Sequence, residues 1–445
     1  MIWIELAICL ACIIIGSRIG GIGMGVVAGL GLIIFVFVLG MPPGSPPVIV
    51  LGMILAVITA LSTMEAAGGL DYLVNVAEKV MRKNPKSITF VAPLVTYVLI
   101  FASGTQHVIY ALLPVISEIS VKAGVRPERP MSISVIAAMH GLIASPISAA
   151  TVALVGSLGG LDVSLPQIMM ITIPATLIAV LIGALSVMRR GKELADDPDY
   201  REKLEKGLLK DGAKAELKVL EGLELKRAKG STIMFFTAII IVVIVGMFPS
   251  LRPTYEVMIK GAMQSGQISM GNTIIILMLA TAGIIMMFFK APAAKTVASK
   301  TMKSGIVALI SILGISWLGS SFYTANQNVI VGSISGMIEG HQWVFAIGLF
   351  VLSILLFSQA ATVTILIPVG VALGISPSIL IGVYPAVNGY FFLPTYGTVI
   401  AAVSFDQTGT TKIGKYLVNH SFMLPGLVTT ISAVAIALIL TTVIL

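Results

Sequence analysis

The chain has 445 residues, of which 57% are hydrophobic and only 11% are charged, and its formal net charge is +8. Apolar runs near or above the roughly 20 residues that cross a bilayer recur along the chain, which predicts a polytopic membrane protein. The length of the chain therefore indicates how many membrane spans it contains rather than how many soluble domains. The excess of Lys and Arg lies in short loops between the runs, as the bias toward basic residues on the cytoplasmic side predicts. The charge thus does not indicate a nucleic-acid partner.

The N-terminal half predicts five spans and one hairpin. The first span is taken to begin at the N-terminus, because MIWIELAICL has no early basic residue and is a poor secretory signal. Cys9 and Cys12 lie inside this span, where a metal ion would lack further ligands and a disulfide is not expected. The predicted spans cover residues 1–17, 19–40, 48–70, 131–157 and 168–188, and the hairpin covers 88–124.

Basic residues predict the direction of these spans. Segment 70–86 is amphipathic and basic, which places it on the cytoplasmic side and the N-terminus outside. Its basic residues are Lys79, Arg82, Lys83 and Lys86. The next apolar run ends in another basic loop, VKAGVRPERP. Because both flanks are basic, we interpret this run as a re-entrant hairpin that turns at residues 103–105 and returns to the same side.

The C-terminal half repeats this plan after a charged segment. Residues 189–229 hold 12 of the 28 Lys and Arg and 10 of the 20 Asp and Glu, so we interpret 189–230 as a solvated cytoplasmic linker without a site. Further spans are predicted at 231–249, 272–289, 305–322, 377–403 and 421–445, with a hairpin at 341–375. No Lys or Arg lies between positions 303 and 412, so the flanks of this hairpin are predicted to lie outside.

The two hairpins thus enter from opposite sides. The predicted fold is an all-α polytopic membrane protein, an inverted repeat of five transmembrane helices plus one re-entrant hairpin per half, with about ten helices and two hairpins. Its parts are an N-terminal repeat (1–188), the linker (189–230) and a C-terminal repeat (231–445). This architecture is typical of a secondary transporter.

One helix in each half is interrupted in the same way. When His140 is set beside Asn388, the stretches MHGLIASPISAATV and VNGYFFLPTYGTVI align without a gap. Gly141 then matches Gly389 and Pro146 matches Pro394, and these four residues are predicted to break the hydrogen-bond ladder. Freed N–H groups can hold an anion and freed carbonyls can hold a cation. We therefore predict a binding site at the two breaks and the two hairpin tips.

The predicted site holds an anion without Lys or Arg, because none occurs at 87–121, 130–188 or 304–411. Substrate-binding candidates are hydroxyls, amides and backbone positions at the tips and breaks. They are Ser103, Gly104, Thr105, Gln106, Ser145, Pro146, Ser148, Ser358, Gln359, Thr362, Asn388, Gly389, Thr395, Tyr396 and Thr398. For each Ser and Thr, a hydrogen bond to its own helix or close packing is the alternative interpretation.

The candidate site also contains ionisable groups. His107 and His140 are candidate protonatable residues, and a neutral packed histidine is the alternative for each. Glu65, Glu118 and Asp406 lie near predicted helix ends, where we expect them to reach the membrane boundary without a site role.

These same stretches resemble a known family. The strings SGTQHVIYALLPV, RPERPMSIS, IASPIS, VNGYFFLPTYGT and GTTKIGKYLVNHSFMLPG resemble the anaerobic four-carbon dicarboxylate uptake transporters, the Dcu family of bacterial inner membranes. The resemblance implies transport of fumarate, succinate, malate and aspartate, with fumarate entering as succinate leaves. It also implies membership of a wider ion transporter superfamily, whose dicarboxylate members are homodimers with a scaffold domain and a transport domain.

Several expectations follow from the resemblance. The transport domain would contain both hairpins and both broken helices, and residues 1–40 and 231–289 would form the scaffold and dimer contact. We expect no cofactor, no metal site, no nucleic-acid partner and no enzymatic activity, a lipid environment, and a homodimer with both termini in the periplasm. The Asn of the superfamily's tip motif is absent here, so sodium ions and protons stay open as coupling ions. A sensor-kinase partner of the linker is left unknown.

Two alternatives belong to other classes. A cation or proton antiporter would place paired acidic residues near the breaks, and none lies at 131–157 or 377–403. An intramembrane enzyme would need a nucleophile beside a base. His140 and Ser145 are five positions apart, which does not place helix side chains on one face. Within transport, a cation-coupled symporter of dicarboxylates or of another small organic anion is the alternative to an antiporter.

Overall fold

The chain forms two compact units that interleave along the sequence. The computed structural model describes residues 2–19, 22–46, 48–158, 161, 163–206, 219–259, 262–338, 341–356, 358–394, 396–414 and 419–445. Unit 1 consists of residues 1–70, 151–168 and 220–327, and unit 2 consists of residues 71–150, 169–219 and 328–445. Each unit therefore combines segments from both halves of the chain.

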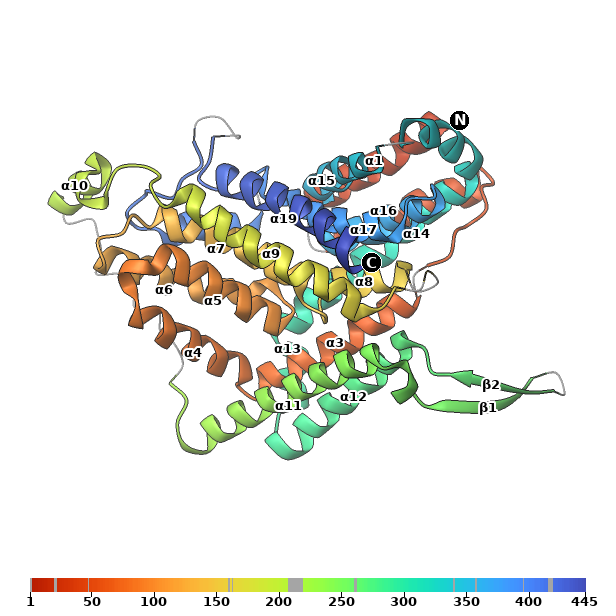
Figure 1. Ribbon diagram of the computed structural model, residues 1–445, viewed down its shortest axis with the longest axis horizontal. Helices are drawn as coiled ribbons and strands as arrows, with labels where there is room; N and C mark the ends of the chain where they lie inside the picture. The colour runs from red at the N-terminus through yellow and green to blue at the C-terminus, as the bar shows by residue number, and fades with distance from the viewer. Residues whose placement is uncertain are drawn as a thin grey trace. The chain divides into compact units, whose positions relative to one another are not determined.

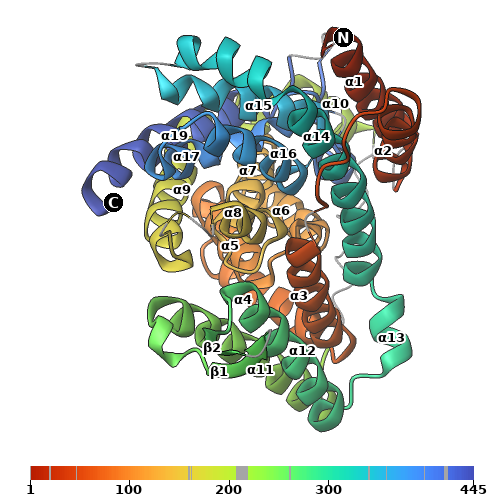
Figure 2. The ribbon, with the colours of Figure 1, turned by 90° about the vertical axis from the view of Figure 1, so that its right-hand side faces the viewer.

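Unit 1 is built mainly from apolar helices. Its elements are α1 (Ile2–Ile19), α2 (Gly23–Ile33), the π-helical turn η1 (Ile34–Val38), α3 (Val48–Ala66), α11 (Gly222–Met247), η5 (Pro249–Leu251), β1 (Thr254–Ile259), β2 (Ala262–Gln267), α12 (Met270–Phe289), α13 (Ala293–Ala298) and most of α14 (Lys300–Ile338). Helix α3 packs against α12, and α11 lies beside both (Figure 2). The carboxylate of Glu65 accepts hydrogen bonds from the backbone N–H groups of Lys300 (3.3 Å) and Thr301 (3.2 Å). Glu65 thus caps the N-terminus of α14 rather than only reaching the membrane boundary.

Unit 2 is organised around a buried helix. Its elements are α4 (Gly69–Lys83), η2 (Pro85–Ser87), α5 (Ile88–Ser103), η3 (Gln106–Val108), α6 (Ile109–Lys122), α7 (Glu128–Ala144), most of α9 (Leu165–Val187), η4 (Leu194–Asp196), α10 (Pro198–Glu205), η6 (Gln342–Val344), α15 (Phe345–Leu356), α16 (Gln359–Ala372), α17 (Pro377–Val383), η7 (Tyr384–Phe391), α18 (Gly397–Phe405) and α19 (Met423–Ile444). Helix α8 (Ala149–Leu158) starts in unit 2 and continues into unit 1. Every residue of α7 except Leu142 is buried, and α5 runs alongside it (Figure 1).

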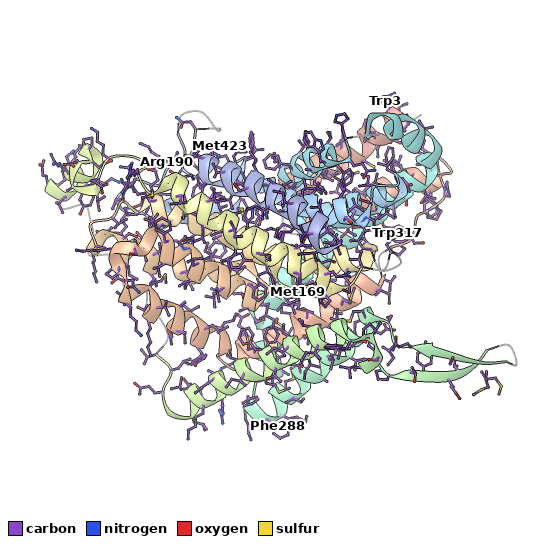
Figure 3. The ribbon with its side chains drawn as sticks, viewed as in Figure 1. Trp3, Met169, Arg190, Phe288, Trp317 and Met423 are labelled. Atoms are coloured by element: carbon purple, nitrogen blue, oxygen red, sulfur yellow. The ribbon has the colours of Figure 1, made fainter. Side chains whose placement is uncertain are left out.

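The helices are those of a multi-pass membrane protein. Among the described residues, eight helices are long and apolar enough to cross a bilayer. They include the first arm of the first predicted hairpin, Pro85–Ser103, so this arm is long enough for a full crossing. The predicted count of about ten differs because α1 and α2 give shorter apolar segments and the second broken helix divides into short pieces. Large apolar side chains such as Trp3 and Phe288, 78% and 71% exposed, project outward and fit contact with lipid (Figure 3).

Two parts of unit 1 depart from the predicted elements. The all-α prediction is wrong for residues 254–259 and 262–267, where β1 and β2 pair in antiparallel register from Thr254 with Gln267 to Ile259 with Ala262. The β-branched and aromatic residues of TYEVMI favour a strand, and this signal is overlooked when only long apolar runs are counted. Helix α14 extends beyond the predicted span at 305–322 to Ile338, since no proline stops it.

Candidate functional site

The first hairpin turns at a left-handed glycine. Helix α5 ends at Ser103 because Gly104 adopts φ 62°, and the Gly104 N–H donates to the carbonyl of Ile100 over 2.8 Å. The Ser103 side chain is fully buried, and its Oγ lies 3.4 Å from the carbonyl oxygens of Ile100 and Thr105. A Cβ at Gly104 would lie 2.7 Å from Cγ1 of Ile147, so this tip contacts the first helix break.

The second hairpin turns before α16. Ser358 is the N-cap of this helix, and its Oγ accepts from the backbone N–H of Ala361 over 3.2 Å. The Thr362 hydroxyl donates to the Ser358 carbonyl over 2.7 Å. The two hydroxyls therefore serve the end of their own helix, which is the alternative that the sequence leaves open.

The first break separates α7 from α8. Ser145 has extended backbone (φ −72°, ψ 128°) because the residue before a proline is disfavoured in helical conformation. Pro146 lies within the break, and Ser148 is buried beside it. The prediction that Gly141 breaks this helix is wrong, since α7 continues through it to Ala144. A single glycine costs a helix only about 1 kcal/mol, which buried packing outweighs.

The second break follows a distorted helix. Residues Tyr384–Phe391 form the 3₁₀ segment η7, which has a kink at Asn388 (φ −92°, ψ 18°). Pro394 follows η7, and Thr395 lies outside the described residues. Tyr396 is extended, and α18 then begins at Gly397. In the register that pairs His140 with Asn388, Gly397 corresponds to Ala149, the first residue of α8. The second pieces of both broken helices thus start at equivalent positions.

The matched glycines allow close packing of helices. A Cβ at Gly141 would lie 2.7 Å from the backbone oxygen of Tyr97 in α5. A Cβ at Gly389 would lie 2.5 Å from the backbone oxygen of Phe350 in α15. Since α5 and α15 are the first arms of the two hairpins, glycine plays the same packing role in both halves.

Gln106 joins the first tip to the second broken helix. Its Oε1 accepts from the hydroxyl of Tyr390 over 2.8 Å, and its Nε2 donates to Oγ1 of Thr398 over 3.3 Å. The ring of Tyr390 lies edge-on against Tyr396, with centroids 4.6 Å apart. Sequence reasoning missed Tyr390. Its place two residues after Asn388 was the available signal, because a buried tyrosine hydroxyl usually finds a hydrogen-bond partner.

Gln359 joins the second tip to both broken helices. Its Nε2 donates to the backbone oxygen of Met139 over 2.9 Å and to Oδ1 of Asn388. The next residue, Gly389, donates its N–H to Oγ of Ser353 over 2.8 Å. Unit 2 therefore brings the two tips and the two breaks together.

Four buried polar atoms in this region have no hydrogen-bond partner among the described residues. They are His140 Nε2, Ser145 Oγ, Gln359 Oε1 and Asn388 Nδ2. Buried polar atoms in native proteins are almost always paired, so these unpaired atoms at the tips and breaks are candidates for contact with a ligand or water. His107 lies in η3, and its side chain is outside the described residues. Within the described part of the chain, no group of three or more His, Cys, Asp or Glu is arranged to hold a metal ion.

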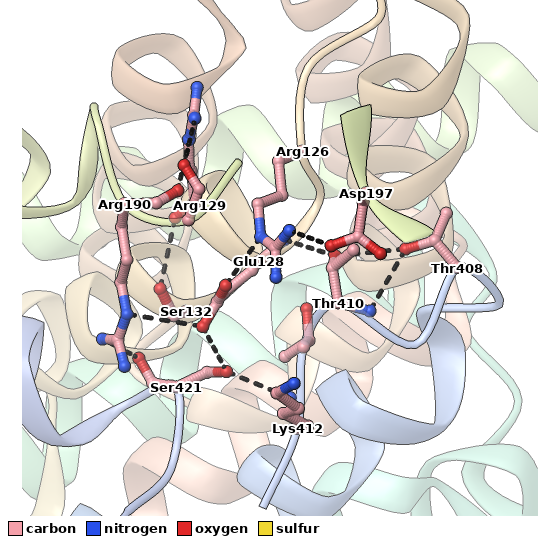
Figure 4. Close-up of polar contacts among 12 residues, drawn as sticks. Arg126, Glu128, Arg129, Ser132, Arg190, Asp197, Thr408, Thr410, Lys412 and Ser421 are labelled. Atoms are coloured by element: carbon pink, nitrogen blue, oxygen red, sulfur yellow. Dashed lines mark hydrogen bonds and ion pairs between the residues drawn. The ribbon is translucent and has the colours of Figure 1, made fainter. Parts of the chain in front are cut away.

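A second polar cluster in unit 2 is charged and lies at the start of α7 (Figure 4). Arg126 pairs with Glu128 (2.8 Å) and Asp197 (2.5 Å), and Glu128 also accepts from Ser421 over 2.8 Å. Arg190 Nε lies 3.4 Å from Glu128. Although burial disfavours the charged guanidinium, the two carboxylates raise the pKa of Arg126. The start of the linker, through Asp197, is thus part of a buried ion-pair network.

Asp406 and Glu118 also have defined partners in unit 2. Asp406 is buried and accepts from Oγ1 of Thr410 over 2.8 Å and from the N–H of Thr411 over 2.6 Å. Glu118 pairs with Lys122 at 2.6 Å and with Arg82 of α4 at 3.3 Å. Folding thus gives these carboxylates defined partners, in addition to the predicted place near helix ends.

His420 satisfies a carbonyl at the second break. Its Nδ1 accepts from the N–H of Phe422 over 3.2 Å, so its Nε2 carries the proton and donates to the oxygen of Phe392 over 3.1 Å. Burial lowers the pKa of His420; the bond to Phe392 opposes this effect, and nearby Arg190 adds to it. The neutral imidazole is thus favoured in the folded protein.

Comparison with known proteins places this geometry in a family. A family described as anaerobic C4-dicarboxylate membrane transporters matches residues 1–445. The chain belongs to this family. The C4-dicarboxylate transporter DcuA of Wolinella succinogenes is 40% identical over 445 residues, covering 100% of both chains. DcuA of Escherichia coli K12 is 41% identical over 427 residues, 96% of each chain, and DcuB of Escherichia coli O6:H1 is 37% identical over 431 residues, 96% of this chain and 95% of that one.

Solved structures share the fold of this Dcu-family protein. MtrF of Neisseria gonorrhoeae, described as illuminating a class of antimetabolite efflux pumps, aligns with a TM-score of 0.51 at 13% identity, over 87% of this chain and 80% of that one. The YdaH transporter of Alcanivorax borkumensis aligns with a TM-score of 0.53 at 14% identity, over 88% and 84%. Family and relatives are membrane transporters, so this Dcu-family chain is a membrane transporter and not an enzyme.

Proposed function

We propose that the protein carries fumarate, succinate, malate and aspartate across the bacterial inner membrane, exchanging one diacid for another. The relatives named as C4-dicarboxylate transporters support this substrate class. The observation that carries the proposal is the meeting of both hairpin tips with both broken helices in unit 2, where Gln106 and Gln359 make the bridging hydrogen bonds.

The proposed site binds a diacid through neutral donors and helix ends. Helix α7 has no Lys or Arg after Arg129, and η7 and α18 have none at all. The carboxylates would therefore be held by Asn388 Nδ2, by the Ser145 hydroxyl and by backbone N–H groups at the start of α8 and α18. A site without a fixed cation binds a dianion less strongly than one with a bidentate arginine, which favours release on the far side. We assign the substrate to this place.

The proposed mechanism is an elevator. Unit 2 contains both hairpins, α7 and the second broken helix, and unit 1 contains residues 1–40 and 231–289 together with most of α8, the second piece of the first broken helix. In this mechanism unit 2 is the moving transport part and unit 1 is the scaffold. In the empty carrier, the polar tips would be exposed to lipid without a ligand, so the empty carrier would cross slowly. Transport is then an exchange, because the carrier returns only when it is loaded. Assembly as a homodimer, periplasmic termini and the inverted relation of the two repeats belong to the same proposal.

The test is counterflow of labelled fumarate in proteoliposomes. Vesicles of purified protein are loaded with succinate or left empty, and an Asn388→Ala variant is compared with Ser404→Ala, which removes an exposed hydroxyl on α18 outside the site. We expect uptake only with internal succinate, loss of uptake in Asn388→Ala, and unchanged uptake in Ser404→Ala.

Other outcomes separate the parts of the proposal. Equal uptake by empty vesicles that depends on sodium or on a pH gradient would replace exchange with symport. Full activity of Asn388→Ala would place the substrate elsewhere. Failure of every diacid to enter would overturn the substrate class.

A further inference from the structure

Two backbone carbonyls of α7 determine which polar groups at the site are free. The oxygen of Ile136 lies 3.0 Å from His140 Nδ1, and since a carbonyl can only accept, Nδ1 carries a proton. In the neutral ring, Nε2 is then a hydrogen-bond acceptor. The oxygen of Met139 also can only accept, so the Gln359 atom 2.9 Å away from it is the NH₂ nitrogen. Gln359 Oε1 is then a second free acceptor.

The same reasoning extends to Asn388. Its Oδ1 accepts from the NH₂ group of Gln359, so the Asn388 NH₂ group is the free donor. The described part of the site therefore offers two unpaired acceptors and one unpaired donor, together with the Ser145 hydroxyl, which can act in either way. His140, Ser145 and Asn388 are fully buried and Gln359 is 5% exposed, so bulk water does not satisfy them.

A fully ionised diacid such as fumarate pairs with only part of this set of groups. Its carboxylates only accept hydrogen bonds, so they pair with Asn388 Nδ2 and Ser145 but leave both acceptors unpaired. A carboxylate oxygen placed against His140 Nε2 or Gln359 Oε1 would also be repelled. The occupant that satisfies the site brings a donor as well as acceptors.

We propose that His140 Nε2 and Gln359 Oε1 form a subsite for a hydrogen-bond donor on the substrate. This inference rests on the proposed function, because the ligand is the transported diacid. The donor is an ammonium or hydroxyl group on the second carbon, or a proton on one carboxyl group. In either case the protein discriminates diacids by what they donate and not only by their carboxylates.

Few other titratable groups lie on the elements packed against α7. They are Tyr97 of α5, His107 of η3, Tyr110, Glu118 and Lys122 of α6, and Tyr384 and Tyr390 of η7. Glu118 is already paired with Lys122 and Arg82. Helices α9, α18 and α19 contribute none in their described ranges.

The experiment compares competitors of labelled fumarate uptake in proteoliposomes. Inhibition constants are measured at pH 7 for succinate, which lacks a donor on its second carbon, and for malate and aspartate, which have one. The variants are His140→Phe, which fills the same space without an acceptor, His140→Gln, which restores an acceptor, and Ser404→Ala as a control. A second arm measures succinate from pH 7 to pH 5.5.

If the donor is on the second carbon, His140→Phe weakens malate or aspartate about tenfold relative to succinate, and His140→Gln restores most of this ratio. If the donor is a carboxyl proton, wild-type affinity for succinate rises on acidification and His140→Phe abolishes the rise. A folded His140→Phe variant that changes neither the ratio nor the pH response, or weakens all three diacids equally, overturns the subsite. Should this variant not fold, His140→Leu carries the same test, because it also lacks an acceptor and leaves the bridging hydrogen bonds of Gln359 in place.

The outcome also separates this subsite from the proposed function. If no diacid competes with fumarate in the wild-type protein, the proposed function fails. If all three diacids compete and their ratios do not respond to either variant, only the donor subsite fails.

Discussion

Replacing Gly141 with alanine tests the packing that brings the first hairpin against the central helix of unit 2. The added Cβ would lie 2.7 Å from the backbone oxygen of Tyr97 and 3.2 Å from its Cα. Both atoms belong to the backbone of α5, so no side-chain rotation relieves the contact. The two helices must separate by roughly 0.7 Å for the methyl group to reach ordinary van der Waals distance.

The magnitude follows from two opposing effects. Overpacking of a buried site costs about 1–3 kcal/mol, and the better helix propensity of alanine returns up to about 1 kcal/mol. We expect a net loss of about 1–2 kcal/mol in the free energy of unfolding. With an unfolding entropy of about 2.1 cal/mol/K per residue, the 445 residues give about 1 °C per kcal/mol, so the unfolding temperature falls by roughly 1–2 °C. Transport also falls, because Met139 and His140, at the site, lie in the same turn as Gly141.

The assay is thermal unfolding of purified protein in detergent, followed by size-exclusion chromatography, with fumarate counterflow measured in parallel. Gly348→Ala in α15 is the matched control, since nothing lies within 4 Å of its added Cβ. Gly389→Ala is the partner test in the other half, because its Cβ would meet the Phe350 oxygen at 2.5 Å. We expect the control to be neutral or slightly stabilised and both tests to be destabilised.

The reasoning is refuted if Gly141→Ala unfolds at the wild-type temperature, or if Gly348→Ala is destabilised equally. In the first case, α5 and α7 are not held at this distance. In the second case, the loss is a general effect of changing glycine in these helices. Destabilisation of only one of Gly141→Ala and Gly389→Ala would show that the two halves do not use the matched glycines alike.

Three further predictions concern polar groups outside the site and use the same thermal assay. Glu65→Gln weakens the cap of α14 and costs about 1 kcal/mol, and an unchanged unfolding temperature would show that the cap is not formed in solution. Arg126→Gln removes the guanidinium that pairs with two buried carboxylates and costs about 3–5 kcal/mol. Lys206→Gln, in an exposed pair, costs less than about 1 kcal/mol, and similar losses in both variants would contradict the burial of the cluster. Because the pKa of His420 is lowered in the folded state, its contribution to stability is present above the ordinary histidine pKa of about 6.5 and is lost as the pH falls further. Stability should therefore drop between pH 7.5 and 5 more steeply in the wild type than in His420→Asn, and equal slopes would contradict this origin.

The membrane class and the position of the breaks are determined by the sequence itself. Long apolar runs must form helices in a bilayer, because only helices satisfy their own backbone groups there. Proline lacks an N–H and restricts the preceding residue, so Pro146 and Pro394 mark the breaks whatever surrounds them. Gly104, with its left-handed backbone, similarly ends α5. These effects act over a few residues, which is why the sequence predicts them.

The same local reasoning fails where a neighbour from elsewhere in the chain decides the outcome. Gly141 is part of a continuous helix, because the close approach of Tyr97 requires a small residue without requiring a break. Ser358 and Thr362 are used by the end of α16. Strands β1 and β2 are short and less apolar than the membrane helices, so a search for long apolar runs does not find them.

Only the tertiary structure decides which polar atoms at the site are free. Gln106 finds its partner Thr398 at a separation of 292 residues, and Gln359 finds Met139 at a separation of 220. The composition identifies these side chains as polar groups in an apolar chain, but not what each one contacts. Hydrogen bonds saturate, so a single distant carbonyl determines whether an amide leaves a donor or an acceptor for a ligand. That choice depends on folding, because it is made by atoms that are close in space and far apart in the sequence.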